Sequence, residues 1–449
     1  MGENVFIKGT GKQKLWGWLI NQLKNKGFWN NVVLENSTVT VKKPGLQRLV
    51  PKFVYEYEKY ANTEIEIVKE MRKYFADFHE YYSRLNEANQ NNYNLLSYHE
   101  VLDIYNILIY HYLRLLLDEG ISLVIFNRPY HTSQDFTLYK LAKVLNIKTL
   151  ILHQFAHQQN RFFHVFENED FGDFNTSIKS SNKTEFFKVE RKYEKEHDYM
   201  ISYYEKKKSL KGKLTNSSIV QLFIDYYKGH NFFSSLYRFK LLKNYKKNLA
   251  TYAVSEVNLS KNYIYFALHL QPEMTTSNWG GIFCDQVLAI EQLSEILPLG
   301  WKIYVKENPK QQNFQRSKYF FKRLNAIDNV TLVDSAFDTY SLLKNSRIAA
   351  TITGTVGWEA VTGGKPVIIF GFGTWYKTIP GVHLFNKDLE LEQIANTKII
   401  HDEVEKAYNT IMEYTHQGVV YAFKRIDTPE QIKENREAVY RAFLNILNY

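Results

Sequence analysis

Cysteine is almost missing from this sequence, and proline and long apolar runs are scarce as well. The single cysteine among 449 residues, Cys284, excludes an intramolecular disulfide and a thiolate metal cluster, and is typical of a reducing compartment. No stretch approaches the ~20 apolar residues that a membrane-spanning helix needs. We therefore expect a cytoplasmic protein, with peripheral attachment to the inner membrane face as an alternative.

Two familiar phosphate-binding motifs are also absent. No Gly-Lys-Ser/Thr follows a glycine-rich loop at the spacing of a Walker loop, and no G-x-G-x-x-G joins an expected strand to a helix. ATP hydrolysis and dinucleotide binding are therefore disfavoured, and no cofactor is expected. His153 and His157 have the spacing of a zinc motif, but the glutamate of H-E-x-x-H is missing, so no metal is predicted.

The chain has enough residues and apolar content for two domains. Its 449 residues exceed what one hydrophobic core usually supports, and 45% of them are apolar. The net charge of +10 suits a nucleic acid, an anionic membrane face or an acidic substrate. Charge alone does not choose among these partners.

The N-terminal part changes from a helical pattern to alternating strand and helix near Gly120. Apolar residues three and four apart predict helices through the residues before it. Short apolar runs at 121–126 and 147–152 then flank an amphipathic helix at 133–145, with Ser133 as the expected N-cap. Strand, helix and strand at this spacing predict a parallel sheet.

A second alternation of strands and helices occupies the C-terminal half. Helical segments fill the gaps between five short apolar runs, at 263–270, 302–306, 330–333, 348–353 and 366–370. The pattern is typical of a doubly wound Rossmann-like domain, in which the ligand lies beyond the carboxyl ends of the strands.

The strongest functional signal is the junction of the fourth of these strands with the helix after it. Thr353-Gly354-Thr355 ends the strand, and Gly357 and Glu359 follow in the helix. Glycines let backbone N–H groups approach an anion, and a helix N-terminus offers a phosphate free donors and a positive dipole end. Glu359 is placed to accept hydrogen bonds from ribose hydroxyls. An ordinary capped turn with a surface glutamate is the alternative.

Two further segments follow strands of the same domain. Gln271 and Glu273 come after the first strand, where Pro272 ends the ladder, and both are expected to face the ligand. Lys306 and Asn308 end the second strand, and they can neutralise a phosphate and donate to it. Each pair could instead be an ordinary polar loop. Because the carboxyl ends of parallel strands share one edge, the three segments predict one site.

These motifs resemble the capsular polysaccharide synthesis proteins. The resemblance rests on Gln271-Pro272, on Val305 to Pro309, on Thr353 to Ala360 and on Gly364 to Val367, and it covers roughly residues 263–383. That family consists of retaining GT-B transferases that move 3-deoxy-ulosonic acids such as Kdo from CMP-activated donors. The resemblance implies an α/β fold of the GT-B type, with two Rossmann-like domains facing a central cleft, and a nucleotide-sugar site formed by the residues named above.

One departure from the family pattern bears on the donor. The family's loop usually ends in His-Pro, whereas Asn308 precedes Pro309 here. The change removes a cation beside the phosphate, and it makes another CMP-nonulosonic acid, such as pseudaminic acid, a credible donor. Transferases that use UDP- or CDP-linked donors, including glycerophosphotransferases, have the same fold and remain alternatives.

An enzyme of this kind needs a carboxylate at the anomeric carbon and a general acid or base nearby. The segment after the strand at 147–152 supplies the catalytic candidates, because it combines histidines with acids: His157, Glu167, Glu169 and Asp170. Candidates for binding the acceptor or the sugar follow the preceding strand or lie in a glycine- and aromatic-rich loop after the last strand: Arg128, His131, Asp135, Tyr376 and His383.

The predictions divide the chain into four parts: an N-terminal acceptor-binding α/β domain (1–187), a basic helical bridge (188–255), a donor domain (256–400) and C-terminal helices (401–449) that return to the first domain. The expected partners are a CMP-sugar donor, a saccharide or glycolipid acceptor, and the cytoplasmic membrane face or a polysaccharide assembly complex. Basic and aromatic residues at 206–247 suggest a nucleic-acid-binding protein as a rival. We expect no nucleic-acid partner, because the strand-to-helix motifs would have no role in one.

Overall fold

The computed structural model describes residues 2–9, 13–35, 41–43, 46–48, 65–89, 98–174, 178–180, 185–191, 232–421 and 426–448. The chain forms two compact units. The first unit lies within residues 1–85, 95–186 and 409–449, and the second within residues 86–94 and 187–408. Most of the basic segment expected as a bridge lies outside the described residues, and its last part forms helix α9 (Phe232–Tyr252).

A six-stranded sheet is the centre of the first unit, with the strand order β14-β7-β6-β5-β1-β2. The neighbouring pairs among β2, β1, β5 and β6 are parallel, whereas β7 runs antiparallel to both β6 and β14. The strands are β1 (Glu3–Lys8), β2 (Trp29–Glu35), β5 (Leu123–Phe126), β6 (Lys148–Gln154), β7 (Arg161–Val165) and β14 (Thr415–Gln417).

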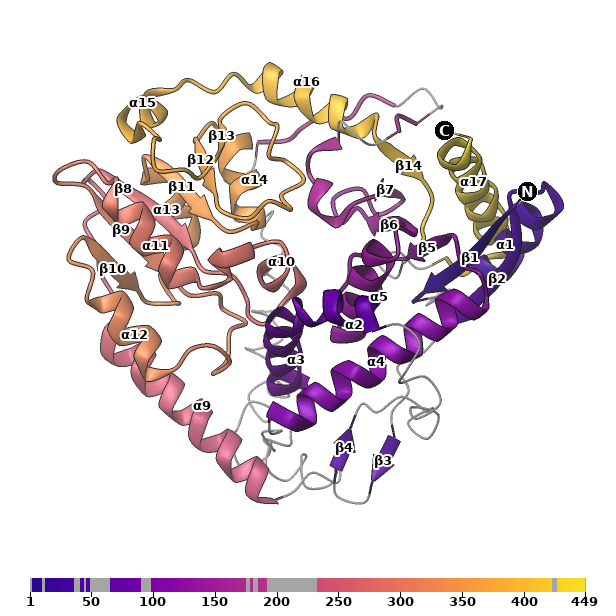
Figure 1. The fold of residues 1–449 in the computed structure, drawn as a ribbon. Helices are drawn as coiled ribbons and strands as arrows, with labels where there is room; N and C mark the ends of the chain where they lie inside the picture. Colours follow the sequence, from indigo (N-terminus) through magenta and orange to yellow (C-terminus); the bar gives the residue numbers. More distant parts are fainter. Residues whose placement is uncertain are drawn as a thin grey trace. The chain divides into compact units, whose positions relative to one another are not determined.

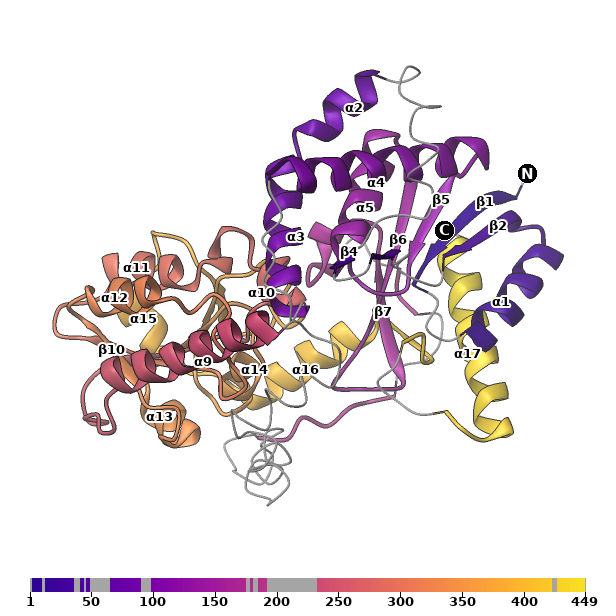
Figure 2. The ribbon, with the colours of Figure 1, turned by 90° about the horizontal axis from the view of Figure 1, so that it is seen from below.

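Helices cover both faces of this sheet (Figures 1 and 2). On β1, Val5 and Ile7 belong to a core with residues of α1 and α17, whereas Phe6 points to the other face and packs edge-on against Tyr112 of α4. The alternation of side chains along a strand accounts for this division. The elements outside the sheet are α1 (Gln13–Asn25), α2 (Ile65–Arg72), α3 (Phe75–Asn89), α4 (Tyr98–Asp118), α5 (Ser133–Val144), α17 (Pro429–Leu447), the 3-10 helix η2 (Asn168–Asp170) and the hairpin β3 (Val41–Lys43) and β4 (Leu46–Arg48).

The second unit contains a wholly parallel sheet with the order β10-β9-β8-β11-β12-β13. Counted within the unit, this is the Rossmann order 3-2-1-4-5-6. The strands are β8 (Tyr263–Ala267), β9 (Lys302–Lys306), β10 (Val330–Val333), β11 (Ile348–Thr351), β12 (Val367–Ile369) and β13 (Val382–Leu384).

Alternating residues of β8 face two different layers of helices in the second unit. Ile264 and Phe266 join a core that includes residues of α9, α11 and α12. Tyr263 faces the other way, and its hydroxyl donates to the carbonyl of Leu342 on α13. The helices that follow α9 are α10 (Met274–Ser277), the 3-10 helix η5 (Gly281–Cys284), α11 (Gln286–Glu295), α12 (Lys318–Asn325), α13 (Thr339–Asn345), α14 (Thr355–Thr362), α15 (Leu391–Asn396) and α16 (His401–Met412).

The expectation of an α/β fold with two Rossmann-like domains is confirmed by the two sheets. The helical interpretation of the residues before Gly120 is wrong at its start, because β1 and β2 are the edge of the first sheet. The N-cap of α5 is Thr132 and not Ser133, since the Thr132 side chain accepts from the N–H of Asp135. Among the helices that the structure describes, none is long and apolar enough to cross a membrane.

Candidate functional site

The order of strands in the second sheet reverses between β8 and β11. In open α/β sheets the ligand binds at the carboxyl edge where the order reverses, because the connections leave that edge in opposite directions and open a crevice. The segments after β8 and β11 carry most of the residues expected to bind a nucleotide. The sheet therefore brings the expected segments to the edge at which a Rossmann-like domain binds its ligand.

A buried histidine joins these two segments. Nε2 of His269 lies 3.2 Å from the backbone N of Thr353 and 3.0 Å from Oγ1 of Thr351. Because a backbone N–H can only donate, Nε2 accepts, and the ring proton is on Nδ1, 3.1 Å from Oγ1 of Thr276. Burial and the charge of Arg316 lower the pKa of His269 to about 4. The imidazole is therefore neutral near pH 7, and it fixes the end of β11 to the end of β8.

The N-terminus of α14 has donors available for an anion. Gly354 is its N-cap, and no side chain in the described part of the chain caps the helix. The N–H of Gly354 points back to Oγ1 of Thr351, 3.3 Å away. The next two N–H groups, of Thr355 and Val356, have no partner within the helix, as in the first turn of any α-helix. Thr355 is exposed, so a phosphate can reach this turn.

The glycines of this junction make room for side chains behind it. A Cβ on Gly354 would lie 2.6 Å from Oγ1 of Thr351 and 2.7 Å from Nε2 of His269. A Cβ on Gly357 would lie 2.2 Å from the hydroxyl oxygen of Tyr376. The structure therefore gives a reason for both glycines that differs from the predicted close approach of an anion.

Tyr376 supports the junction from the interior. The side chain is fully buried, and its hydroxyl donates to the carbonyl oxygen of Gly354. Burial, with a smaller effect of Glu359, raises the pKa of Tyr376, so the phenol keeps its proton. Tyr376 was expected to bind the acceptor or the sugar, but a fully buried ring has no surface for either.

Gln271 belongs to a buried polar network. Its Oε1 accepts from Arg316 NH1 and from Gln286 Nε2, both at 2.6 Å, and its Nε2 donates to the carbonyl of Cys284, also at 2.6 Å. Arg316 in turn makes two bonds to the carboxylate of Glu307, at 2.7 and 3.3 Å. Gln271 thus holds three loops together, whereas the sequence suggested contact with the nucleotide.

Lys306 and Asn308 also make internal contacts. Lys306 is buried, and its Nζ lies 2.6 Å from Oγ1 of Thr339 at the start of α13. Oδ1 of Asn308 accepts from the N–H of Lys310 at 3.0 Å, which closes a tight turn after β9. The expected phosphate contacts would therefore compete with bonds that the protein already makes.

The remaining donor-side candidates differ in exposure. Glu273 is exposed at the start of α10, and it is the N-cap residue there without a side-chain capping bond among the described residues. Glu359 is half-buried in the second turn of α14. His383 was expected in a loop, but it lies on β13 opposite Ile368, and burial lowers its pKa.

The first sheet has its own reversal of strand order, between β1 and β5. Lys8 ends β1, and its buried Nζ lies 2.7 Å from Oε2 of Glu35, 2.8 Å from the hydroxyl of Tyr112 and 4.0 Å from Oδ1 of Asp135. Burial and the charge of Lys8 lower the pKa of the neighbouring His111 to about 3. Such clusters of buried charge at the carboxyl edge of a sheet are typical of functional sites.

Asn127 lies in the same place, at the end of β5. The residue is 1% exposed, and neither its Oδ1 nor its Nδ2 meets a hydrogen-bond partner among the described residues. Gly9, with φ of 83°, follows β1, and a Cβ there would lie 2.5 Å from Oδ1 of Asn127. An unpaired buried amide costs about 1–3 kcal/mol, so the Asn127 amide needs a hydrogen-bond partner that no described residue supplies.

The sequence could have indicated this cluster. An apolar run at Val5 to Ile7, followed by Gly9 and a helix that begins at Gln13, is the pattern of a first Rossmann strand. Because β2 contains several polar residues, the sequence pattern did not indicate a strand there. Lys8, Glu35 and Asn127 were consequently absent from the predicted site.

The predicted acceptor residues after β5 lie at this edge. NH1 of Arg128 donates to the hydroxyl of Tyr421 at 2.9 Å, and the guanidinium lies 5.5 Å from the centre of the same ring. Oδ2 of Asp135 accepts from the N–H groups of Thr132 and His131. Burial and the charge of Arg128 lower the pKa of His131. Asp135 thus uses Oδ2 to cap the start of α5, whereas its Oδ1 faces Lys8.

The predicted catalytic carboxylates lie at the opposite edge of the sheet. Because β7 runs antiparallel to β6, the chain has returned to the start of β6 when it reaches Glu167. There Glu167 shares a surface pocket with Lys148 and Leu123, the first residues of β6 and β5. The prediction assumed that these acids follow the carboxyl end of a parallel strand, and that premise is wrong. His157, in the turn between β6 and β7, stays at the carboxyl edge.

Glu167 and Glu169 have side-chain partners at the amino edge. The hydroxyl of Tyr139 lies 3.1 Å from Oε2 of Glu167 and 2.7 Å from Oε2 of Glu169. Glu167 also pairs with Lys143, and Asp170 ends the 3-10 helix η2. No group of three or more histidine, cysteine, aspartate or glutamate side chains within the described ranges is arranged to hold a metal ion.

Comparisons with known structures give distant likenesses. The beta Kdo 2,7 transferase KpsC of Thermosulfurimonas dismutans is 10% identical over 97% of this chain and 99% of its own, with a TM-score of 0.35. The beta Kdo 2,4 transferase of the same organism is 13% identical over 69% and 88%, with a TM-score of 0.30. The UDP-GlcNAc 2-epimerase of Methanocaldococcus jannaschii is 13% identical over 92% and 99%, with a TM-score of 0.26. At these values the likenesses carry no functional argument.

The family is indicated by the sequence itself. No curated protein matches the chain. Residues 184–417, more than half of the chain, match a family described as capsule polysaccharide biosynthesis protein, and they include the whole second sheet with its β8 and β11 junctions. The protein therefore belongs to the capsule polysaccharide biosynthesis family.

Proposed function

We propose that the protein is a glycosyltransferase of capsule or surface polysaccharide synthesis. It moves a 3-deoxy-ulosonic acid, either Kdo or a nonulosonic acid such as pseudaminic acid, from a CMP-activated donor to a saccharide or glycolipid acceptor. The observation that carries the proposal is the α14 N-terminus at the reversal of strand order, where exposed donors are held in place by the neutral His269.

The donor half uses the geometry of this junction. The N–H groups of Thr355 and Val356 and the dipole of α14 bind the phosphate of the CMP ester. Glu359, farther along the helix, accepts from the ribose hydroxyls. The buried network of Gln271, Arg316 and Glu307 holds the neighbouring loops without contacting the donor.

The acceptor half is assigned to the carboxyl edge of the first sheet. In the reaction an acceptor hydroxyl forms a bond to the anomeric carbon, the bond from that carbon to the phosphate oxygen breaks, and CMP leaves with its electrons. The proton of the hydroxyl goes to a carboxylate, for which Glu35 and Asp135 beside Lys8 are the candidates. Glu167, Glu169 and Asp170 are not retained in this role, because they lie at the other edge. Retention at the anomeric carbon is proposed from the family resemblance alone, and it requires the acceptor hydroxyl to attack the same face of that carbon from which CMP leaves.

Thermal unfolding with added nucleotides tests the donor. A ligand that binds only the folded state raises the unfolding temperature, so millimolar CMP should stabilise the protein more than UDP or CDP at the same concentration. Stabilisation by UDP or CDP alone would show that the donor carries a different nucleotide, and the proposed transferase function would still stand. If none of the three stabilises the protein, the nucleotide site itself is refuted.

Glu359→Ala tests the assignment of the ribose contact. We expect CMP affinity to fall about tenfold, the equivalent of one lost hydrogen bond to a charged group, with little change in the unfolding temperature. Glu256→Ala, an exposed glutamate of the same unit, is the matched control. Unchanged CMP affinity in Glu359→Ala would remove the ribose role.

A further inference from the structure

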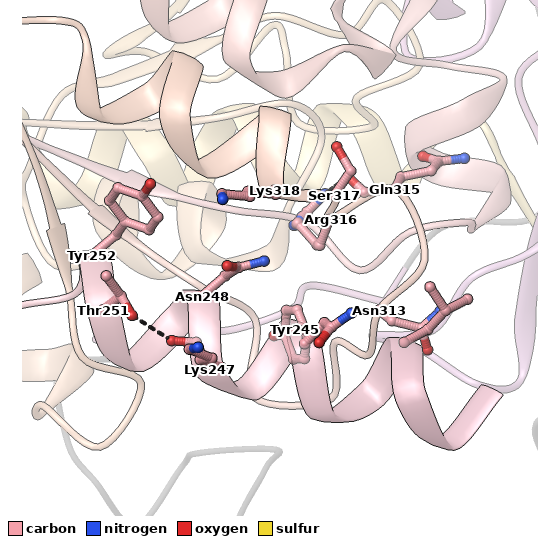
Figure 3. A pocket seen from close by; sticks show the side chains of 12 residues that line it. Tyr245, Lys247, Asn248, Thr251, Tyr252, Asn313, Gln315, Arg316, Ser317 and Lys318 are labelled. Carbon is pink, nitrogen blue, oxygen red and sulfur yellow. Dashed lines mark hydrogen bonds between the residues drawn. The ribbon is translucent and has the colours of Figure 1, made fainter. Parts of the chain in front are cut away.

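A second pocket lies on the second unit, between α9 and the loop that precedes α12 (Figure 3). Its volume is about 760 Å³, enough for two or three sugar rings. Seven lining residues come from α9, between Leu241 and Tyr252, four come from the loop, between Asn313 and Ser317, and Lys318 is the first residue of α12. Neither the α14 junction nor Glu359 lines it, so it is separate from the proposed donor site.

The lining of this pocket is positively charged. Lys247 and Lys318 are exposed, one from each side, and the lining residues that the structure describes include no aspartate or glutamate. Arg316 also lines the pocket, but its charge is balanced by the buried Glu307 behind it, whose oxygen lies 2.7 Å from Nε. The two lysines therefore leave an excess of positive charge, which favours an anionic ligand.

The same pocket is also rich in amides. Asn244 and Asn248 stand one turn apart on α9. Asn313 and Gln315 come from the loop (Figure 3). Asn313 is 8% exposed, and its Oδ1 has no hydrogen-bond partner among the described residues. A buried acceptor of this kind needs a donor, which a fully ionised small anion cannot provide. A ligand that satisfies Asn313 must therefore carry hydroxyl or amide groups in addition to a negative charge.

The backbone of this loop adopts a conformation that costs free energy. Gln315 has a backbone φ of 54°, in the left-handed region that residues other than glycine and asparagine seldom adopt. Its neighbour Arg316 holds the loop through bonds to Glu307 and Gln271. On the α9 side, Tyr245 and Tyr252 supply the apolar part of the lining. Rings, amides and cations together are suited to the apolar faces, hydroxyls and carboxylate of a sugar acid.

We propose that this pocket binds an acidic saccharide as a second, non-catalytic site. The ligand is a short glycan with carboxylate groups, which pair with Lys247 and Lys318 while its hydroxyls bond to Asn313 and the other amides. This inference does not depend on the donor or on the transfer reaction. Its role, which does rest on the proposed function, is to hold a growing acidic chain on the protein between transfers.

A glycan array of acidic and neutral oligosaccharides, probed with the whole chain, tests the proposal. We expect the wild type to bind carboxylated oligosaccharides above neutral ones of equal length, and to do so equally with CMP present at saturation. Lys247→Gln with Lys318→Gln should weaken that binding about tenfold or more, because both cations that pair with the carboxylates are removed. The affinity of this double variant for CMP should not change.

A matched pair of substitutions on the same helix controls for charge alone. Lys243→Gln with Lys246→Gln removes two exposed lysines of α9 that do not line the pocket, and it should leave glycan binding intact. An equal loss in this control would show that binding follows net charge, and would overturn the proposal. So would competition by CMP, displacement by inorganic phosphate at equal concentration, or the absence of any preference for acidic glycans. Asn313→Ala, checked for thermal stability, should lower affinity for the same glycans.

Discussion

The imidazole Nε2 of His269 accepts a hydrogen bond from the backbone N–H of Thr353, 3.2 Å away, and so ties the ends of β8 and β11 together. The same nitrogen accepts from the hydroxyl of Thr351 at 3.0 Å. These strands flank the point at which the order of the second sheet reverses. Together with Tyr376, this neutral ring fixes the position of the α14 N-terminus, and hence of the proposed phosphate site.

Replacing His269 should reduce both stability and nucleotide affinity. His269→Leu leaves the N–H of Thr353 without an acceptor in the interior, at a cost of about 1–3 kcal/mol in the free energy of unfolding. His269→Gln offers a carbonyl in place of Nε2 and should cost less. We expect CMP affinity, measured by calorimetric titration, to fall about tenfold in the leucine variant and less in the glutamine variant. Wild-type CMP affinity in His269→Leu would contradict the supporting role of the ring.

The protonation of His269 should appear in the pH dependence of stability. Its pKa is about 4 in the folded protein, against 6.5 in the unfolded chain. The unfolded chain therefore takes up the proton first, so this contribution to stability is complete above pH 6.5 and is lost as the pH falls toward 4, by at most about 1.4 kcal/mol per pH unit. Urea unfolding at about pH 7 and about pH 5 should show a smaller loss for His269→Gln than for the wild type. Equal losses would mean that the ring is not neutral and buried.

Gly357 and Tyr376 provide a test of the packing behind α14. A Cβ on Gly357 would lie 2.2 Å from the hydroxyl oxygen of Tyr376, so Gly357→Ala should destabilise the protein by about 1–3 kcal/mol. Tyr376→Phe removes that oxygen but also its bond to the carbonyl of Gly354. The double variant should therefore be more stable than the sum of the two single effects predicts. Strictly additive free energies of unfolding would argue against the contact.

The sequence predicts the second sheet better than the first for a physical reason. The strands at Lys302–Lys306 and Val330–Val333 have the predicted bounds, because buried parallel strands are continuous apolar runs between polar turns. The strand at Trp29–Glu35 is half polar, since it forms an edge of its sheet, and the helical pattern around it concealed it. Edge strands carry a weaker signal than central ones.

The site was less predictable than the fold. The residues near Gln271 and Gly354 were expected at one edge, and they do lie there, but the roles of their side chains depend on partners such as His269 and Arg316 that are distant in sequence. The turn before Arg161 reverses the chain without a glycine or proline to announce it. Because of that one turn, the acids after β7 lie at the edge opposite to the predicted one.

The buried ion pair of Glu307 and Arg316 should be a major determinant of stability. Both side chains are almost inaccessible, and two bonds of 2.7 and 3.3 Å join them. Glu307→Leu leaves the guanidinium charge buried without a counter-ion, and we expect a loss of about 3–5 kcal/mol in urea unfolding. Lys387→Gln, which removes an exposed ion pair with Glu295, should cost less than about 1 kcal/mol. Similar losses for the two variants would contradict this account.

Measurements of transferase activity can show which edge of the first sheet carries the catalytic carboxylate. Glu35 and Asp135 lie beside Lys8 at the carboxyl edge, whereas Glu167 and Glu169 share the hydroxyl of Tyr139 at the amino edge. CMP release can be followed with CMP-Kdo and with CMP-pseudaminic acid, using whichever donor the wild type consumes. Loss of a general base lowers kcat by about 100-fold or more, so Glu35→Gln or Asp135→Asn should have that effect.

The combined Glu167→Gln and Glu169→Gln variant should keep kcat within about twofold, because neither carboxylate lies at the edge where a Rossmann-like sheet binds its ligand. Asparagine retains an oxygen that can accept from the start of α5, so Asp135→Asn should fold, and its unfolding temperature provides the control. A loss of about 100-fold in the amino-edge variant, with normal rates in both carboxyl-edge variants, would return catalysis to the acids after β7. It would also mean that the reaction does not follow the reversal of strand order, which is the premise that assigns Lys8, Glu35 and Asn127 to the acceptor.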